Sequence, residues 1–373
     1  MRAIFVDTLI DNNMILPTYK SLEEKKKFFH YEKPEQINTI KEFRSAMKKY
    51  EEEKYFLFRG VNEAKYKLYT SAQREWMTQE WDRQGCSFVE FVDGLLSRIK
   101  DHNVLMAYHK SLKVYNNDLL YLSFLQHYGA PAPLIDFTYD IRVALFFALD
   151  NLVFNKKGSE DIDNYFSLYR INRSEINGLR EHYENANRIR DKEIEAKKQS
   201  PTTDSEATLS LFNRVFKWYD PEGYGLCNLQ KSGLFFLLIP NPYYSFYMEE
   251  VPNANLFWSN PNIIAQRGCF LLNPDQEMTF DEVLEAFTLN FLNEYNLTGT
   301  KEEKYHRSYL RVDCLDIHKS LAPYIREEYL KSEGITTETI YPDFNAIANE
   351  AYEAFKRNPT AKISPADLPD SKD

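Results

Sequence analysis

The first residues that could do chemistry come directly after a short apolar run. The run Tyr55–Phe58 predicts a buried strand, and Arg59 and Gly60 follow it. A guanidinium beside a buried strand is costly unless it has a partner. A glycine behind it lets a ligand or a backbone segment come close. Arg59 and Gly60 are therefore candidate ligand-binding residues, and the alternative is an ordinary ion pair between Arg59 and a carboxylate.

A second group of polar residues gathers around a turn between two apolar helices, in the span Gln126–Thr138. The side chains that could act on or hold a ligand there are His127, Tyr128, Asp136 and Thr138. Polar groups on a loop between rigid elements indicate function, and a histidine with an aspartate can serve as an acid–base pair. The alternative is that His127 and Asp136 stabilise the turn by hydrogen bonds.

The third group is the segment Asn262–Phe270, in which Gln266 and Gly268 lead into a predicted strand. Gln266 could present its amide to a ligand, or it could be a paired polar residue at a strand start. Motifs that are typical of other chemistries are missing from the sequence, namely GxxxxGK(S/T), GxGxxG, HExxH and GxSxG. The four cysteines form no CxxC pair, and no metal site is predicted.

Short strands scattered among longer helices must position these groups. Strands are predicted at 55–58, 165–171, 234–239, 268–272 and 309–314, and the segment 130–137 is interpreted as a loop. Helices are predicted at 34–50, 76–112, 118–128, 140–148, 316–331 and 341–355, with Asp316 as the cap of the fifth. Because strands and helices do not alternate regularly, the expected fold class is α+β, a single compact mixed domain of short strands surrounded by helices.

The predicted organisation is an N-terminal extension over 1–34, a domain over 35–357 that carries a charged insertion at 173–207, and a frayed tail over 358–373. Of the 373 residues, 43% are hydrophobic, which is enough for a real core. The net charge of -10 argues against a general nucleic-acid coat. No apolar run is long enough to span a membrane and no signal peptide is recognisable, so a cytoplasmic protein without a membrane partner is expected.

Taken together, the three groups resemble the FRG domain, a family with a Phe-Arg-Gly signature. The tripeptide Phe58–Gly60 matches that signature, and Gln126–Thr138 is similar to a second family block, Q-H-Y-G-x-P-T-x-L-L-D-W-T. Further blocks of the family are similar to Val143–Ala148, Ile264–Phe270 and Gly334–Phe344. The resemblance therefore identifies the domain over 35–357 as an FRG domain.

Members of this family resemble bacterial and phage-associated toxins or defence effectors, and the order of the blocks is similar to that in ADP-ribosyltransferases. The resemblance implies a fold of that kind, NAD as the substrate, a macromolecular acceptor and a neutralising partner protein. The residues that it assigns to NAD binding are Arg59, Gly60, Tyr128 and Thr138. Gln266 stands where the catalytic glutamate is expected. Because an amide cannot act as a general base, Asp136 or His127 is expected to take the proton.

Two other functions are consistent with the same residues. A nucleotide or nucleic-acid hydrolase would use His127 and Asp136 as its acid and base. A non-catalytic module would bind a small ligand or a partner protein without turning it over, and a ligand would then raise the thermal stability without forming a product.

Overall fold

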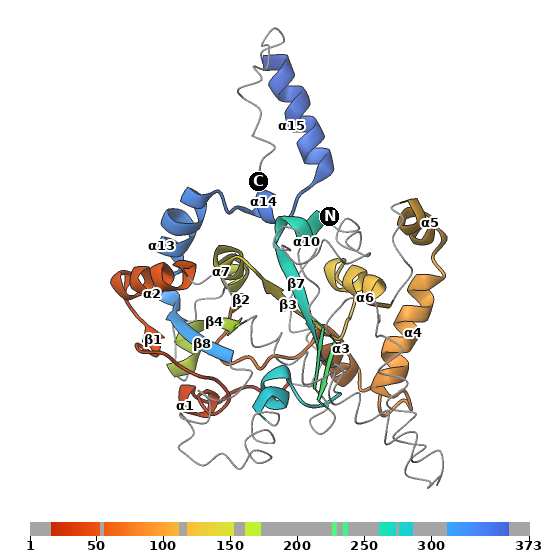
Figure 1. The fold of residues 1–373 in the computed structure, drawn as a ribbon, viewed down its shortest axis with the longest axis horizontal. Helices are drawn as coiled ribbons and strands as arrows, with labels where there is room; N and C mark the ends of the chain where they lie inside the picture. The colour runs from red at the N-terminus through yellow and green to blue at the C-terminus, as the bar shows by residue number, and fades with distance from the viewer. Residues whose placement is uncertain are drawn as a thin grey trace.

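The computed structural model describes residues 16–52, 56–111, 118–152, 161–172, 226–229, 234–237, 261–273, 276–285 and 312–357. This part of the chain forms a six-stranded mixed sheet surrounded by helices (Figure 1). The strand order is β1-β8-β4-β2-β3-β7, in which β1 and β8 are parallel and all other neighbours are antiparallel. A separate antiparallel pair joins β5 and β6. The α+β fold class is confirmed.

The strands are β1 Gln36–Ile37, β2 Phe56–Val61, β3 Leu134–Thr138, β4 Tyr165–Asn172, β5 Leu226–Leu229, β6 Leu234–Leu237, β7 Gly268–Leu272 and β8 Val312–His318. The helices are α1 Leu22–Lys25, α2 Ile40–Glu52, α3 Ser71–Thr78, α4 Phe88–Lys100, α5 Asn103–Ser111, α6 Asp118–His127, α7 Ile141–Leu149, α10 Pro261–Ala265, α13 Ala322–Tyr324, α14 Thr337–Ile340 and α15 Phe344–Arg357. Short 3-10 turns at Asp161–Asn164, Lys319–Leu321 and Lys331–Glu333 and a π-helical segment at Ile325–Leu330 complete the described helical structure.

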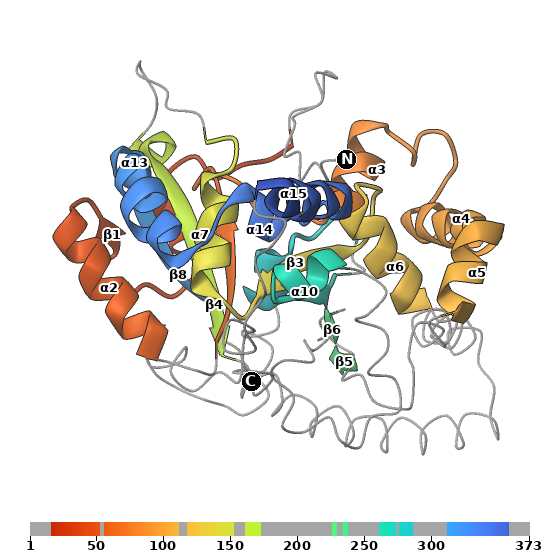
Figure 2. The ribbon, with the colours of Figure 1, turned by 90° about the horizontal axis from the view of Figure 1, so that it is seen from above.

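The sheet is nearly divided between the neighbouring strands β2 and β3, the fourth and fifth in this order. β2 pairs with β4 over its whole length, and β3 pairs with β7 over its whole length. Between β2 and β3, in contrast, Phe58 and Thr138 are the one pair in register. In Figure 2, β4 and β8 lie left of the centre and β3 with α10 lies to their right, next to α6. The described sheet thus consists of two parts, here called half-sheets, whose backbones pair at one position while an apolar cluster packs against both.

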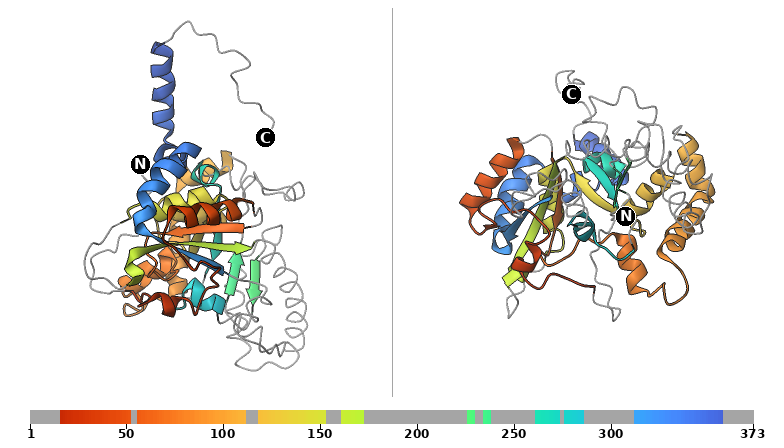
Figure 3. Two further views of the ribbon diagram at one scale, coloured as in Figure 1. Left: turned by 90° about the vertical axis from the view of Figure 1, so that its left-hand side faces the viewer. Right: turned by 60° about the horizontal axis from the view of Figure 1, so that its bottom comes forward.

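Three groups of buried apolar side chains stabilise this arrangement. Helices α2 and α7 pack on one face of β2, β4 and β8 through residues such as Phe43, Met47 and Ala144. The segment around α1 and the segment 276–285 cover the other face. Helices α3 and α6 pack against β3, and α4 packs on α3 and α6 (Figure 3). Helix α7 contacts β3 as well as β2 and β4, and one apolar cluster includes residues of β2, β4, β3 and β7, so side-chain packing joins the two parts of the sheet.

Several sequence-based predictions of elements are confirmed. The strand predicted at 268–272 is β7, the strand at 165–171 is β4, and the helix at 118–128 is α6. Gly129 follows α6 with a φ of +82°, the left-handed conformation that ends helices. Asp140 caps α7 by accepting a hydrogen bond from the Arg142 amide. These elements were predictable because their signals lie within the element itself.

Other predictions are wrong in ways that have physical reasons. The predicted helix 76–112 is three helices, because capping boxes at Thr70 and Ser87 start α3 and α4 separately. Leu134–Thr138 is strand β3 instead of a loop, since it pairs with distant β7. Asp316 lies inside β8, and the following turn is capped by His318. The predicted helix over 34–50 begins only at Ile40, after the short strand β1.

Of the predicted domain boundaries, the one at residue 34 lies within the described residues. Tyr19, Leu22 and Phe29, which belong to the predicted N-terminal extension, are buried in the core beside β2 and β4. The predicted insertion at 173–207 and the predicted tail at 358–373 lie outside the described residues.

Candidate functional site

Arg59 and Asp136 meet where the two half-sheets separate. Arg59 lies inside β2, not after it as expected, and its Nη1 donates a hydrogen bond to the backbone oxygen of Asp136 on β3, at 3.0 Å. The same nitrogen is 3.9 Å from Asp136 Oδ2. The exposed fractions of the two side chains are 17% and 19%. The arginine therefore bridges the strands just beyond their single backbone pair, and both charged groups keep limited access to solvent.

Two further side chains fix the Asp136 carboxylate in place. Gln126 Nε2 donates to Asp136 Oδ2 at 2.7 Å, and Gln126 Oε1 lies 2.9 Å from the hydroxyl of Ser71. Ser71 is the first residue of α3, and its hydroxyl accepts a bond from the Ala132 amide at 3.0 Å. These bonds connect α3, α6 and β3. The carboxylate is consequently oriented by the Gln126 amide, which Ser71 in turn holds in place, and such preorganisation suits a reacting group.

The surroundings of Asp136 shift the pKa of its carboxyl group toward neutral pH. Burial raises the pKa of Asp136 to about 6, against the opposing effects of Arg59, of the Gln126 hydrogen bond and of the nearby charge of Arg74. A carboxylate with a pKa in this range is mostly ionised at pH 7 and can accept and release a proton near that pH. Perturbed pKa values of this kind gather at functional sites.

His127 occupies a different environment from Asp136. Its ring is 2% exposed and packs edge-to-face against Phe270, with the ring centroids 5.1 Å apart. Burial lowers the pKa of His127 to about 3, so the imidazole is neutral and only weakly basic at neutral pH. Successive helical residues point about 100° apart, and in α6 it is the preceding Gln126 that contacts Asp136.

Gly60 allows a close approach by a helix of the protein. A Cβ atom at this position would lie 1.8 Å from the Ala144 backbone oxygen and 2.8 Å from Ala148 Cβ. The absence of a side chain thus lets α7 pack directly on β2. Tyr128, in contrast, is 52% exposed, and its ring lies 4.4 Å from that of Phe124. Of the predicted NAD-binding residues, Tyr128 presents the largest open surface.

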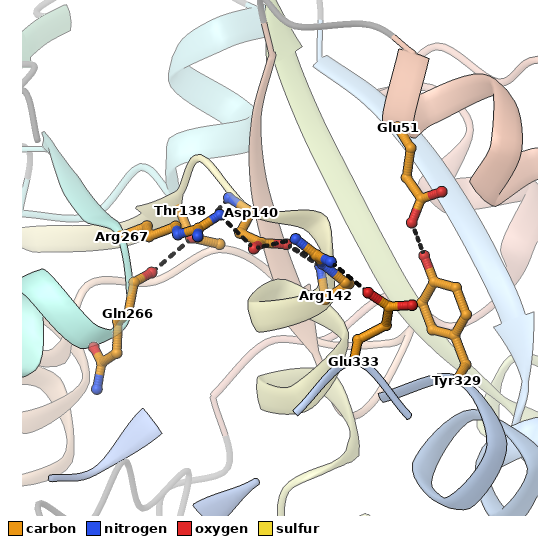
Figure 4. A network of polar contacts seen from close by, with 8 residues as sticks. All are labelled: Glu51, Thr138, Asp140, Arg142, Gln266, Arg267, Tyr329 and Glu333. Atoms are coloured by element: carbon orange, nitrogen blue, oxygen red, sulfur yellow. Dashed lines mark hydrogen bonds and ion pairs between the residues drawn. The ribbon is translucent and has the colours of Figure 1, made fainter. Parts of the chain in front are cut away.

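Thr138 and Gln266 belong to a polar network at the C-terminal end of β3 (Figure 4). The Thr138 hydroxyl donates to the Gln266 backbone oxygen at 2.8 Å and accepts from the Asp140 amide at 3.0 Å. The Gln266 side chain is 3% exposed, and its Nε2 donates to the Ile340 carbonyl at 3.3 Å. The side chain of Gln266 is therefore bonded to α14, which agrees with the alternative that Gln266 is a paired polar residue.

Charged residues extend the same network toward the C-terminal helices. Asp140 accepts two hydrogen bonds from the Arg142 guanidinium, both at 2.9 Å, and one from Arg267 at 3.0 Å. Arg142 also reaches Glu333 at 3.0 Å (Figure 4). Arg267 has a φ of +45°, an uncommon conformation for a residue with a side chain. This network joins the end of β3, the start of α7 and the turn before β7.

Sequence reasoning named Arg59 and Asp136 but gave no role to Gln126, Ser71, Arg74 or Tyr341. Gln126 stands in the same polar block as His127, and only the rotation of α6 distinguishes which of the two faces Asp136. The Tyr341 hydroxyl is buried and has no hydrogen-bond partner among the described residues. Burial and the charges of Asp150 and Asp136 raise the pKa of Tyr341, so the hydroxyl lies within electrostatic reach of the site. No local pattern connects Ser71 or Tyr341 with Asp136.

The described residues show neither a metal-binding cluster nor a helix that could span a membrane. They contain no group of three histidine, cysteine, aspartate or glutamate side chains that could hold a metal ion. Among the helices that the structure describes, none combines the length and the apolar character needed to cross a bilayer.

One of the comparisons with known proteins identifies a family domain in the region around β2, α6, β3 and α7. No curated protein and no solved structure matches the chain. The family model of the FRG domain matches residues 54–157, a range that includes Arg59, Gln126 and Asp136 and leaves out Gln266 and Tyr341. The bridge between the two half-sheets thus lies inside a recognised family segment, and the chain carries an FRG domain.

Proposed function

We propose that the FRG domain binds NAD at the Arg59–Asp136 bridge and transfers ADP-ribose to a macromolecular acceptor, a protein or a nucleic acid. The observation that carries this proposal is a preorganised carboxylate with a pKa of about 6 beside an arginine, both partly accessible, at the junction of two half-sheets. An effector with this activity belongs to bacterial or phage defence or toxin systems, and it requires a neutralising partner protein in the producing cell.

Each group has a defined task in the proposed reaction. The Arg59 guanidinium attracts the NAD pyrophosphate, since guanidinium groups match phosphate oxygens in charge and geometry. The bond between the ribose C1′ and the nicotinamide nitrogen breaks, and a nucleophile of the acceptor forms the new bond to C1′. Nicotinamide leaves as a neutral molecule, and Asp136 takes the proton that the nucleophile loses. Gln126 keeps the carboxylate oriented while this happens.

The predicted hydrolase with a His127–Asp136 pair has less support. A base with a pKa of about 3 takes up a proton poorly at neutral pH, and the His127 ring is packed against Phe270. If Asp136 is the base and water is the nucleophile, NAD is hydrolysed to ADP-ribose and nicotinamide. Isotopically labelled NAD distinguishes the two reactions. Transfer places the label in macromolecules, and hydrolysis places it in free ADP-ribose.

The test compares thermal melting with and without NAD for the wild type, Arg59→Ala and Asp136→Asn. Arg83→Ala serves as the control, because that side chain is 69% exposed and forms a local ion pair with Glu80. We expect NAD to raise the melting temperature of the wild type, Arg83→Ala and Asp136→Asn, and not that of folded Arg59→Ala. Isotopically labelled NAD with cell extract should label macromolecules with the wild type and Arg83→Ala only.

Three results would count against parts of the proposal. Unchanged melting of the wild type at millimolar NAD would remove NAD as the ligand. A shift without any labelled product would indicate a binding module. Equal labelling by the wild type and Asp136→Asn would remove Asp136 as the base.

A further inference from the structure

The hydroxyl of Tyr341, the residue that follows α14, is buried without a hydrogen-bond partner. Its oxygen is shielded from solvent, and none of the described residues donates to it or accepts from it. The aromatic ring lies beside Phe146 and Phe147 of α7, with the ring centroids 6.1 and 6.3 Å away. A buried hydroxyl that forms no hydrogen bond costs free energy, and such groups are rare in folded proteins. A ligand that bonds to this hydroxyl would account for it.

Contacts on two sides connect Tyr341 with β3. Asp136 and Thr138 are two residues apart in β3, so their side chains point to the same face of the sheet. Thr138 donates to the backbone oxygen of Gln266 (Figure 4). The Gln266 side chain in turn donates to the carbonyl of Ile340, the residue before Tyr341. On the other side, α7, which the Tyr341 ring contacts, packs against β3. Tyr341 is therefore held beside the face of β3 that carries Asp136.

Two carboxylates act on the Tyr341 hydroxyl. Burial, and with it the charges of Asp150 and Asp136, raises the pKa of Tyr341, so the hydroxyl keeps its proton at neutral pH. A protonated hydroxyl can donate a hydrogen bond. Asp136 itself already accepts a bond from Gln126 and lies beside Arg59. The Tyr341 hydroxyl is therefore an unused donor close to the carboxylate of the candidate site.

We propose that the Tyr341 hydroxyl donates a hydrogen bond to a hydroxyl of the nicotinamide ribose when NAD is bound. This inference rests on the proposed function, in which the ribose C1′ lies beside Asp136. The 2′- and 3′-hydroxyls of that ribose are carried by the next two carbons of the ring, and each can accept such a bond. Tyr341 lies outside the residues 54–157 that the family model matches. The ligand site thus extends from the FRG segment to the C-terminal part of the chain.

Calorimetric titration of the full chain with NAD tests this contact. Tyr341→Phe removes the hydroxyl and keeps the ring, and we expect it to bind NAD about 3- to 10-fold more weakly than the wild type, the effect of one neutral hydrogen bond. Without NAD the variant should melt no lower than the wild type, because the hydroxyl has no bond to lose. Tyr329→Phe is the matched control. The Tyr329 hydroxyl already donates to Glu51 at 2.5 Å, so its loss should leave the NAD affinity unchanged.

Analogues of NAD that lack either the 2′- or the 3′-hydroxyl of the nicotinamide ribose identify the accepting group. With one of them, the difference in affinity between the wild type and Tyr341→Phe should disappear, because the partner of the tyrosine hydroxyl is then missing. If the difference persists with both analogues, the ribose contact is overturned. Equal binding of NAD by Tyr341→Phe and the wild type also overturns it, and the proposal for Arg59 and Asp136 then stands. A wild type that binds no NAD overturns both.

Discussion

At the scale of single residues, Asp136 combines a fixed geometry with a proton affinity that its surroundings have raised. Gln126 holds one carboxylate oxygen at 2.7 Å, and Arg59 stands at 3.9 Å. Burial still outweighs these favourable contacts and brings the pKa to about 6, from an ordinary value of 3.8. The folded protein therefore binds a proton at Asp136 in a pH range where the unfolded chain has lost it.

This difference predicts how Asp136→Asn changes the dependence of stability on pH. Between pH 4 and pH 6 the folded state binds more protons than the unfolded state, so the contribution of Asp136 to stability falls as the pH rises. The fall is about 3 kcal/mol, at about 1.4 kcal/mol for each pKa unit. Urea unfolding of both proteins at pH 4, 5, 6 and 7 measures it. The variant should gain stability relative to the wild type as the pH rises, whatever constant offset the loss of the carboxylate adds.

Two parallel stability curves would contradict this prediction, because the carboxyl would then titrate alike in the folded and unfolded states. Other buried acids affect both proteins equally and cancel in the difference. Glu63 and Asp281, whose pKa values burial also raises, are examples.

Residue types alone revealed the candidates at this scale but not their contacts. Arg59 and Asp136 stood out because charged groups beside apolar strands need partners. Which residue faces Asp136 depends on the rotation of α6, and the sequence offers both Gln126 and His127. A histidine next to an aspartate in a polar block invites an acid–base interpretation, whereas the structure packs its ring against Phe270.

At the scale of elements, the contact between α7 and β2 is set by a single glycine. A Cβ at Gly60 would overlap the backbone oxygen of Ala144, and backbone cannot move aside as a flexible side chain can. α7 would have to shift away from β2. Because Gly60 is the neighbour of Arg59 in the same strand, the shift would also disturb the arginine bridge.

Gly60→Ala should therefore destabilise the protein by about 1–3 kcal/mol or more, the cost of overpacking a core. Gly94→Ala is a matched control inside α4, where the new Cβ meets only the flexible end of Arg98 at 3.0 Å. That control should be neutral or stabilising by about 0.5–1 kcal/mol. The urea unfolding midpoints of Gly60→Ala and Gly94→Ala measure this difference in stability. Equal midpoints would mean that α7 accommodates the methyl group without cost.

Elements with local signals could be predicted, and elements made by distant pairing could not. α6, α7, β4 and β7 carry their own caps, stops or apolar runs. β3 falls in the segment 130–137 that the sequence analysis interprets as a loop. Its strand character comes from pairing with β7, more than 100 residues later in the chain. The near-separation of β2 from β3, which positions the candidate site, has no sequence signal for the same reason.

At the scale of the whole molecule, buried charges join the two ends of the described chain. Lys25 of α1 donates to Asp316 of β8 and to Ser167 of β4, both at 2.6 Å, and all three residues are 0% exposed. The Tyr31 hydroxyl donates to the other Asp316 oxygen at 2.8 Å. Lys25 and Asp316 are 291 residues apart. A sequence pattern therefore could not reveal their contact, and Asp316 was predicted as a helix cap.

Lys25→Met tests whether this contact holds the N-terminal segment to the sheet. The methionine keeps most of the volume but leaves the Asp316 carboxylate buried without its cation, which costs about 3–5 kcal/mol. Adding Asp316→Asn removes the stranded charge and should restore part of that loss. Lys26→Met is the matched control, since the adjacent Lys26 forms partly exposed pairs with Glu23 and Glu35 that are worth about 0–1 kcal/mol. Urea unfolding measures all four proteins, and a Lys25→Met variant no less stable than Lys26→Met would show that apolar packing alone anchors the segment.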